Sequence, residues 1–313
     1  MAKKKSIISW IAYAAALVGF TTYVMLDTFV LPRVIDSDAD KMNMSLFESQ
    51  APTESAQLST ENGTTAVTET LSTESSYKDE SISIELKEYN AHDTAIYVAD
   101  VQLSSAQYLK TAFANDSYGR NIKDKTSSIA EDKNAIFAVN GDFYGARESG
   151  YVIRNGILYR SSGDSSADVL CIYADGSFAI TNSKEKDAQE LVDEGVWQAF
   201  SFGPALVEDG SFSVSEKDEV GKAMASNPRT AIGIIDELHY VFVVSDGRTS
   251  ESEGLSLFEL AQFMEGLGVK TAYNLDGGGS SSMYFNGKVI NKPTTNGRSI
   301  KARSVSDIVY IGY

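Results

Sequence analysis

Residues 274–283 read Asn-Leu-Asp-Gly-Gly-Gly-Ser-Ser-Ser-Met, and this stretch decides how the 313-residue chain is interpreted. A strand predicted over residues 270–275 ends beside the carboxylate of Asp276, and another strand is predicted over 282–285. Consecutive glycines let a backbone approach a ligand closely and can present N–H donors to an anion. A plainer interpretation is a glycine-rich connection between strands that Asp276 caps. A phosphate-binding P-loop is excluded, because no lysine follows the glycines.

Three other segments share the character of this stretch, since each joins a predicted strand end to polar or charged side chains. They are Asn140-Gly141-Asp142-Phe143, Asn227-Pro228-Arg229-Thr230-Ala231-Ile232-Gly233 and Ser245-Asp246-Gly247-Arg248. Taken alone, each is also explained as a turn with solvated charges. Their joint occurrence at strand ends favours one functional site.

The surrounding pattern predicts an α+β domain over residues 81–313. Alternating apolar residues indicate strands, and Asn155-Gly156 and Asp175-Gly176 are typical hairpin turns. Helices are predicted over 105–114, 127–132 and 255–265, the last with Ser256 and Glu259 spaced as a capping box. We therefore expect a mixed, largely antiparallel sheet with a few packed helices.

In this order the segments resemble the signature of the phosphodiester glycosidase family, which has bacterial exopolysaccharide-associated members. The similarity runs from about residue 135 to the C-terminus. Besides 274–283, the matching elements are 140–143, 201–204 with 209–210, 227–233, 245–248, 254–256, 286–293 and 303–307. Asp142 is a departure, because many relatives have glycine there; it either adds a carboxylate to the site or points to solvent.

The resemblance implies cleavage of a sugar-1-phosphodiester between the anomeric carbon and the phosphate oxygen. The leaving phosphate monoester has a last pKa of about 6, so it needs little protonation. Such a site needs a carboxylate near the anomeric carbon and cations on the phosphate. We expect Asp276 to act as base or nucleophile, and Arg229 and Arg303 to bind the phosphate through their guanidinium forks. Asp142 is a further catalytic candidate.

Other residues of these segments are expected to bind substrate, with the glycine N–H groups directed to the phosphate. They are Asn140, Gly141, Asn274, Gly277, Gly278, Gly279, Ser280, Asp246 and Arg248. No cofactor is required by this scheme. A Ca²⁺ or Mg²⁺ ion stays open, because hard oxygen ligands are available from Asp142, Asp246, Asp276 and Asp307.

An alternative function is a non-catalytic module that binds anionic polysaccharide or a wall polymer and helps to assemble it at the cell surface. A binding module needs an arginine but not the acid. The presence of both Arg229 and Asp276 favours the enzyme, whose substrate would be a phosphorylated glycan or wall polymer.

The N-terminal part predicts a membrane anchor and a stalk. Residues 1–5, with three lysines, are expected to be a cytoplasmic tail, and 6–30 a single transmembrane signal-anchor helix. Residues 31–80 are acidic and rich in Ser and Thr, as in a disordered stalk. This arrangement puts residues 81–313 outside the cell. A cleaved signal peptide is the rival interpretation, but no small-x-small site follows the apolar stretch.

Charge and cysteine content narrow the functional classes. The chain has 27 Lys and Arg against 43 Asp and Glu, a net charge of −16, which argues against a nucleic-acid partner. The only cysteine, Cys171, lies in an apolar run, so no intrachain disulfide forms and a buried apolar role is expected.

Overall fold

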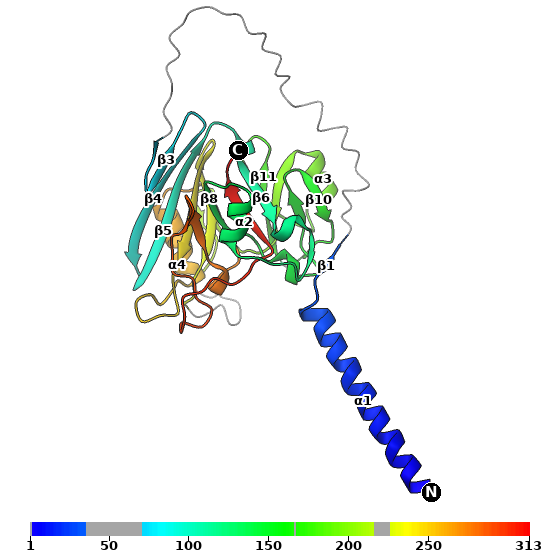
Figure 1. The fold of residues 1–313 in the computed structure, drawn as a ribbon. Helices are drawn as coiled ribbons and strands as arrows, with labels where there is room; N and C mark the ends of the chain where they lie inside the picture. The colour runs from blue at the N-terminus through cyan, green and yellow to red at the C-terminus, as the bar shows by residue number, and fades with distance from the viewer. Residues whose placement is uncertain (1, 36–70, 166, 216–225) are drawn as a thin grey trace, which may run out of the picture.

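The computed structural model describes residues 2–35, 71–165, 167–215 and 226–313 (Figure 1). These residues form α-helices and β-sheets in which every described strand pairing is antiparallel, as the mixed α+β prediction requires. The helices are α1 (Ala2–Phe29), α2 (Thr126–Asp132), α3 (Ala188–Asp193) and α4 (Leu257–Gly266).

The largest sheet has nine strands and forms one side of the domain. Strand β5 forms a long hairpin with β4. Strand β17, far from β5 in sequence, pairs with β5 along the whole length of β17. In spatial order the strands are β15 (Ser211–Phe212), β14 (Ala205–Glu208), β18 (Thr271–Asn274), β16 (Thr230–Asp236), β17 (His239–Ser245), β5 (Thr94–Leu103), β4 (Ile82–Ala91), β3 (Ser76–Lys78) and β2 (Leu71–Ser72).

Two five-stranded sheets complete the domain. The first faces the nine-stranded sheet, and its order is β20 (Lys288–Val289), β19 (Met283–Phe285), β8 (Phe137–Asn140), β21 (Asp307–Ile311) and β6 (Leu109–Phe113). The second lies beside it with α3 (Figure 1), in the order β10 (Ile157–Arg160), β9 (Val152–Arg154), β13 (Val196–Phe200), β11 (Asp168–Tyr173) and β12 (Phe178–Asn182).

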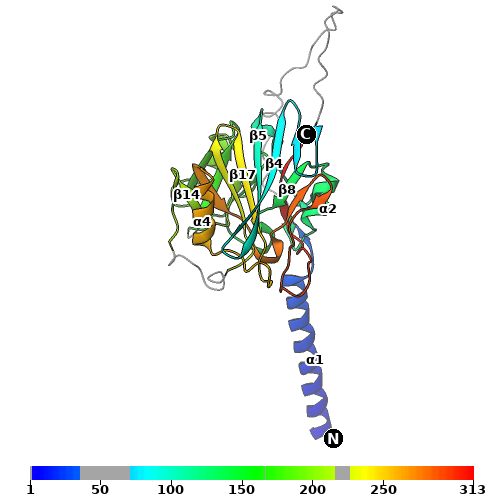
Figure 2. The ribbon, with the colours of Figure 1, turned by 90° about the vertical axis from the view of Figure 1, so that its left-hand side faces the viewer.

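The main apolar core lies between the nine-stranded sheet and the sheet that contains β8. Phe137 of β8 contacts Phe242 of β17 across this interface, with ring centroids 5.0 Å apart. The helix α4 packs on the outer face of the nine-stranded sheet (Figure 2), and α2 packs against the outer face of the other. Cys171 is fully buried, as expected for an apolar role.

Local signals predicted α4 and α2 well but failed at residues 105–114. Ser256 and Glu259 form the predicted capping box at the N-terminus of α4, in which the side-chain oxygen of each residue accepts a hydrogen bond from the backbone N–H of the other. The helix predicted over 105–114 is wrong, because residues Leu109–Phe113 form strand β6. Strand β6 pairs with β21 along its length, and this long-range pairing overrides the local helical propensity.

The N-terminal helix is attached directly to the domain. After α1, strand β1 (Arg33–Val34) pairs with β7 (Gly119–Arg120), and the Asn121 amide donates to the carbonyls of Thr28 and Leu31 at 3.2 and 3.1 Å. Strands β2 and β3 also lie within the range predicted as stalk, so paired structure begins before Ser81. The remainder of the predicted stalk, residues 36–70, lies outside the described residues.

Candidate active site

The predicted segments meet where strands of the two facing sheets end. Strand β18 ends at Asn274, β17 ends at Ser245 and β16 begins at Thr230. These three positions lie together at one end of the strands of the nine-stranded sheet. Asn140 ends β8 in the opposite sheet. Its amide donates to the backbone carbonyl of Asp276 at 2.6 Å, and its Oδ1 accepts from the Thr230 hydroxyl at 2.9 Å. Asn140 therefore joins the two sheets immediately behind Asp276.

A cavity of about 550 Å³ opens in front of this junction. Four of its charged side chains, Asp276, Arg229, Arg248 and Arg303, come from segments that the sequence singled out. Asn274, Gly277 and Gly278 also line it. The structure thus brings most of the predicted site residues into one cavity.

Asp276 is the buried carboxylate of this cavity, with only 8% of its surface exposed. Burial raises the pKa of Asp276 above its ordinary value, and the nearby Asp142 adds to the rise. The Ser280 hydroxyl, the Arg303 guanidinium and the Gly277 N–H oppose this increase by stabilising the ionised form. The Gly277 N–H donates to Asp276 Oδ1 at 2.9 Å. Asp276 therefore holds a proton more readily than a solvated aspartate.

The arginines give the cavity a local positive charge. Arg229 is buried, and its Nε donates to the Leu255 carbonyl at 2.8 Å, just before α4. The pKa of Arg248 is lowered by burial and by the positive charge of Arg303. Cations held near one another in a cavity are stabilised by an anionic ligand, and guanidinium groups match the oxygens of a phosphate.

Glycines 277–279 let the backbone pack closely against its neighbours. They do not present a free row of N–H donors to the cavity. The N–H of Gly277 donates to Asp276, and the N–H of Gly278 donates to the Pro228 carbonyl at 2.7 Å. Gly278 has a φ of +63°, and an added Cβ would lie 2.9 Å from Arg248 Nη2. In this structure both N–H groups are used inside the protein, and the expected binding of phosphate by them stays a prediction.

Asn274 provides a polar acceptor at the cavity wall. Its Nδ2 donates to the Gly203 carbonyl at 2.7 Å, whereas its buried Oδ1 has no hydrogen-bond partner among the described residues. An unsatisfied buried oxygen is costly, and a ligand hydroxyl would satisfy it. This geometry fits the predicted role of Asn274 in substrate binding.

Asp142 lies behind the cavity. It neither lines the cavity nor points to solvent, which were the two positions expected for it. Its carboxylate accepts from Arg154 Nη2 at 2.9 Å and from the backbone N–H of Ser201 at 3.0 Å. Arg154 also donates to Asp307 Oδ2 at 2.9 Å, and all three charged side chains are almost fully buried. Burial chiefly raises the pKa of Asp307 to about 7, with Asp142 adding to the rise and Arg154 opposing it. Asp142 acts on Asp276 only through its charge.

Gly141 and Asp307 connect this buried cluster to the cavity. The Gly141 N–H donates to the Asp307 carbonyl at 2.9 Å, and the Gly141 carbonyl accepts from the Asp276 N–H at 3.2 Å. A Cβ on Gly141 would collide with the Asp307 carboxylate. Gly141 therefore supports Asp276 from behind and does not line the cavity.

The four acids considered as metal ligands do not gather at one point. Asp142 and Asp307 share Arg154, Asp276 faces the cavity, and Asp246 lines a different cavity. Within the part of the chain that the structure describes, no group of three or more His, Cys, Asp or Glu side chains is placed to hold a metal ion.

Several residues of the site carried no recognisable sequence signal. Arg147 lines the cavity with its guanidinium 4.8 Å from the Phe202 ring, and Asp168 lines it as well. Arg154 lies at the end of a predicted hairpin strand, where a charged side chain is ordinarily solvated. Only the packing of three sheets brings these residues to Asp276.

Comparison with known proteins identifies the family of the residues that form most of this cavity. The phosphodiester glycosidase family model matches residues 133–312. An N-acetylglucosamine-1-phosphodiester alpha-N-acetylglucosaminidase of Mus musculus is 30% identical over 172 residues, 50% of this chain and 33% of that protein. The SPbeta prophage-derived uncharacterized protein YomE of Bacillus subtilis (strain 168) is 29% identical over 203 residues, 63% of this chain and 31% of that protein. The chain spans about a third of the length of these relatives.

Solved structures show the same fold at low identity. The zebrafish N-acetylglucosamine-1-phosphodiester alpha-N-acetylglucosaminidase catalytic domain, auto-inhibited by its pro-peptide, has a TM-score of 0.59 at 18% identity, covering 74% of this chain and 83% of that chain. A hypothetical protein from Synechocystis has a TM-score of 0.53 at 15% identity, covering 74% and 62% of the two chains.

Proposed function

This chain belongs to the phosphodiester glycosidase family, and on that premise we propose that it hydrolyses a glycosyl-1-phosphodiester. The observation that carries the proposal is the cavity in which buried Asp276 faces Arg229, Arg248 and Arg303. One carboxylate and several guanidinium groups match the needs of this reaction, which are a group that acts at the anomeric carbon and cations that bind the phosphate.

The reaction breaks the bond between the anomeric carbon and the phosphate oxygen. Water supplies the new oxygen on the sugar, and the phosphate monoester leaves with the bonding electron pair. Asp276 has two roles open to it. As a base it takes a proton from the attacking water, and its raised pKa suits that role. As a nucleophile it forms a glycosyl ester, which water then hydrolyses.

The arginines stabilise the charge that develops on the departing phosphate. Arg229 and Arg303 are the predicted phosphate ligands, and the position of Arg248 adds it to this group. Because the leaving group is already a weak base, electrostatic stabilisation replaces the strong general acid of ordinary glycosidases. We assign Asn274 to the binding of a sugar hydroxyl, because it lines the cavity and its Oδ1 has no hydrogen-bond partner among the described residues.

The proposed location is the cell surface, with α1 as the membrane anchor. Trp10–Phe29 is the helix of the described chain that is long and apolar enough to cross a bilayer, and none of it is buried against the domain. Three lysines precede it, which favours a cytoplasmic N-terminus and an extracellular domain. The proposed substrate is therefore a phosphodiester-linked sugar in a surface glycan or exopolymer.

The test is release of reducing sugar by the full chain in detergent, with a panel of sugar-1-phosphodiesters that includes N-acetylglucosamine-1-phosphodiesters. We expect turnover by the native chain and by Asp193→Asn, and at least a hundredfold loss in Asp276→Asn. Full activity of Asp276→Asn would overturn the assignment of the carboxylate. Binding of anionic glycan without turnover of any panel member would favour the non-catalytic module.

A further inference from the structure

A second and larger cavity, of about 830 Å³, adjoins the one that contains Asp276. The loop that follows β17 separates them, because Asp246 lines the second cavity and Arg248 lines the first. Asp246 and Arg248 are two residues apart in sequence, so their Cα atoms are at most about 7.6 Å from each other. The same short chain segment therefore contributes to the lining of both cavities.

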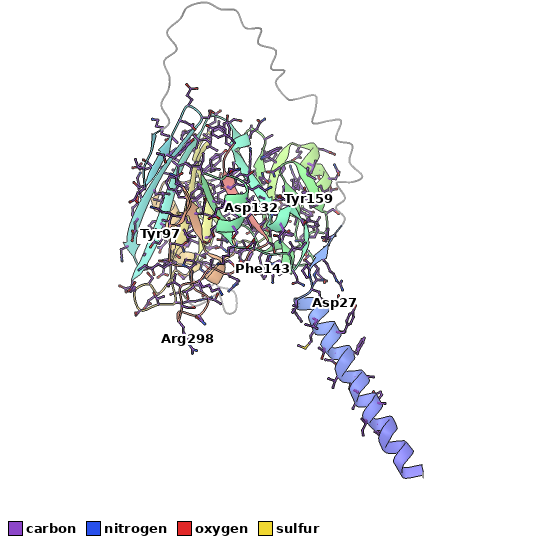
Figure 3. All side chains as sticks on the ribbon, viewed as in Figure 1. Asp27, Tyr97, Asp132, Phe143, Tyr159 and Arg298 are labelled. Carbon is purple, nitrogen blue, oxygen red and sulfur yellow. The ribbon has the colours of Figure 1, made fainter. Side chains whose placement is uncertain are left out.

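The lining of the second cavity combines an apolar floor with hydrogen-bonding groups. Leu86, Ala95, Met283 and Ile290 provide apolar surface, and the side chain of Ile300 at the rim is 57% exposed. Tyr97, labelled in Figure 3, lines this cavity, and its hydroxyl donates to the carboxylate of Asp246 in the same lining. A sugar ring has apolar C–H faces and hydroxyl edges, so this mixture of surfaces fits it.

The charges of the second cavity differ from those of the first. Its described lining has four acids, Glu74, Glu88, Glu251 and Asp246, and two lysines, Lys87 and Lys292, and Glu74 also pairs with Lys288 outside the lining at 2.9 Å. Lys292 pairs with Glu251 at 2.9 Å, and Lys87 pairs with Glu85 at 2.9 Å. An acidic lining repels a phosphate and accepts hydrogen bonds from hydroxyl groups. The arginine-containing cavity suits the phosphate, and the acidic cavity suits an uncharged sugar.

The wall of the second cavity is held in place by Asp246. Its carboxylate accepts from the Tyr97 hydroxyl at 3.3 Å, from Asn291 Nδ2 at 3.2 Å and from the Lys292 N–H at 2.8 Å. Strand β5, the loop after β17 and the segment after β20 are thus tied together at one point. A preformed wall lowers the entropy that is lost when a ligand binds.

We infer that this second cavity is a binding site for uncharged sugar units that adjoin the phosphodiester in the substrate. Its link to catalysis rests on the proposed function, whereas sugar binding itself does not. One wall comes from β4 and β5, which precede the family-matched residues 133–312. The enzyme would accordingly prefer an oligosaccharide or polymer to a single phosphorylated sugar.

The first experiment measures binding of uncharged trisaccharides to the full chain in detergent by saturation-transfer NMR and calorimetry. The probes are triacetylchitotriose, cellotriose, maltotriose and mannotriose. Ala95→Trp fills the cavity from β5, Ser250→Trp fills it from the exposed loop, and Ala174→Trp is the control in an exposed hairpin turn. We expect at least one probe to bind the native chain and the control, with tenfold weaker binding to both cavity variants.

Absence of binding by all four probes would overturn the inference, and so would equal binding to the cavity variants. Ser250 is exposed, so loss of binding in Ser250→Trp cannot be attributed to misfolding. A second arm compares KM for a monosaccharide-1-phosphodiester and an oligosaccharide-1-phosphodiester. Ala95→Trp should raise KM only for the longer substrate and leave kcat unchanged. If no phosphodiester is hydrolysed, the proposed function fails while the binding arm still decides this inference.

Discussion

Arg154 is the buried base that pairs with the two buried carboxylates behind the cavity. Its guanidinium contacts two carboxylates, Asp142 and Asp307, and lies 4.4 Å from the ring of Phe200. Burial is the main reason why the pKa of Asp307 is raised to about 7, and the negative charge of Asp142 adds to the rise while Arg154 opposes it. Removal of the base would leave both carboxylates uncompensated in an apolar environment.

Arg154→Met should therefore destabilise the domain by about 3–5 kcal/mol, the cost of breaking a buried ion pair by removing one partner. The measurement is urea unfolding at pH 7.5, followed by tryptophan fluorescence. Lys270→Met is the control, because Lys270 pairs with Asp236 on the exposed surface and should change stability little. Equal effects of the two substitutions would contradict the structural importance of the buried cluster.

The glycine-rich connection from Asp276 to Met283 is the element that shapes the cavity. Its short turn, Gly278–Ser280, lies against Arg248 and Thr295. Gly278 is in the left-handed region, where a residue with a Cβ is strained by roughly 1–2 kcal/mol. The same Cβ would press on the guanidinium of Arg248.

For Gly278→Ala we expect kcat/KM for a sugar-1-phosphodiester to fall about tenfold, equivalent to roughly 1.4 kcal/mol of transition-state stabilisation. The matched control is Gly266→Ala at the end of α4, where an added Cβ meets nothing within 4 Å. The measurement is steady-state kinetics of both variants. Unchanged kinetics in Gly278→Ala would show that Arg248 does not need its observed position.

At the scale of the whole molecule, the N-terminal helix α1 and the domain are joined by strand pairing and not only by a tether. Arg33 faces Arg120 in the β1–β7 pair, and Ile35 donates to the Tyr118 carbonyl at 3.1 Å. Figure 1 shows α1 leaving the domain beside β1, and Figure 2 shows the same end from the side. This attachment holds the domain next to the membrane surface if α1 is the anchor.

The attachment predicts a specific cross-link. Facing residues of antiparallel strands have Cα atoms about 4.5–5.5 Å apart, within the range of a disulfide. In a Cys171→Ser background, Arg33→Cys with Arg120→Cys should oxidise to an intrachain disulfide in the full chain, detected by mass spectrometry of tryptic peptides. Arg33→Cys with Lys270→Cys, on a different sheet, should not. Absence of the first cross-link would show that the domain is only tethered.

The sequence alone determined the anchor candidate, the mixed α+β class, the capped helix α4 and the family, because each depends on local patterns or on a motif order that the chain itself displays. It also named Asp276, Asn274, Arg229 and Arg248, since charged and polar residues at strand ends indicate a site, and the family resemblance added Arg303. Tertiary structure alone decided the position of Asp142 behind the cavity, the role of Arg154, the strand β6 and the separate cavity at Asp246. These depend on pairing and burial between segments far apart in the chain, and no local pattern reports which face of a distant sheet a side chain meets.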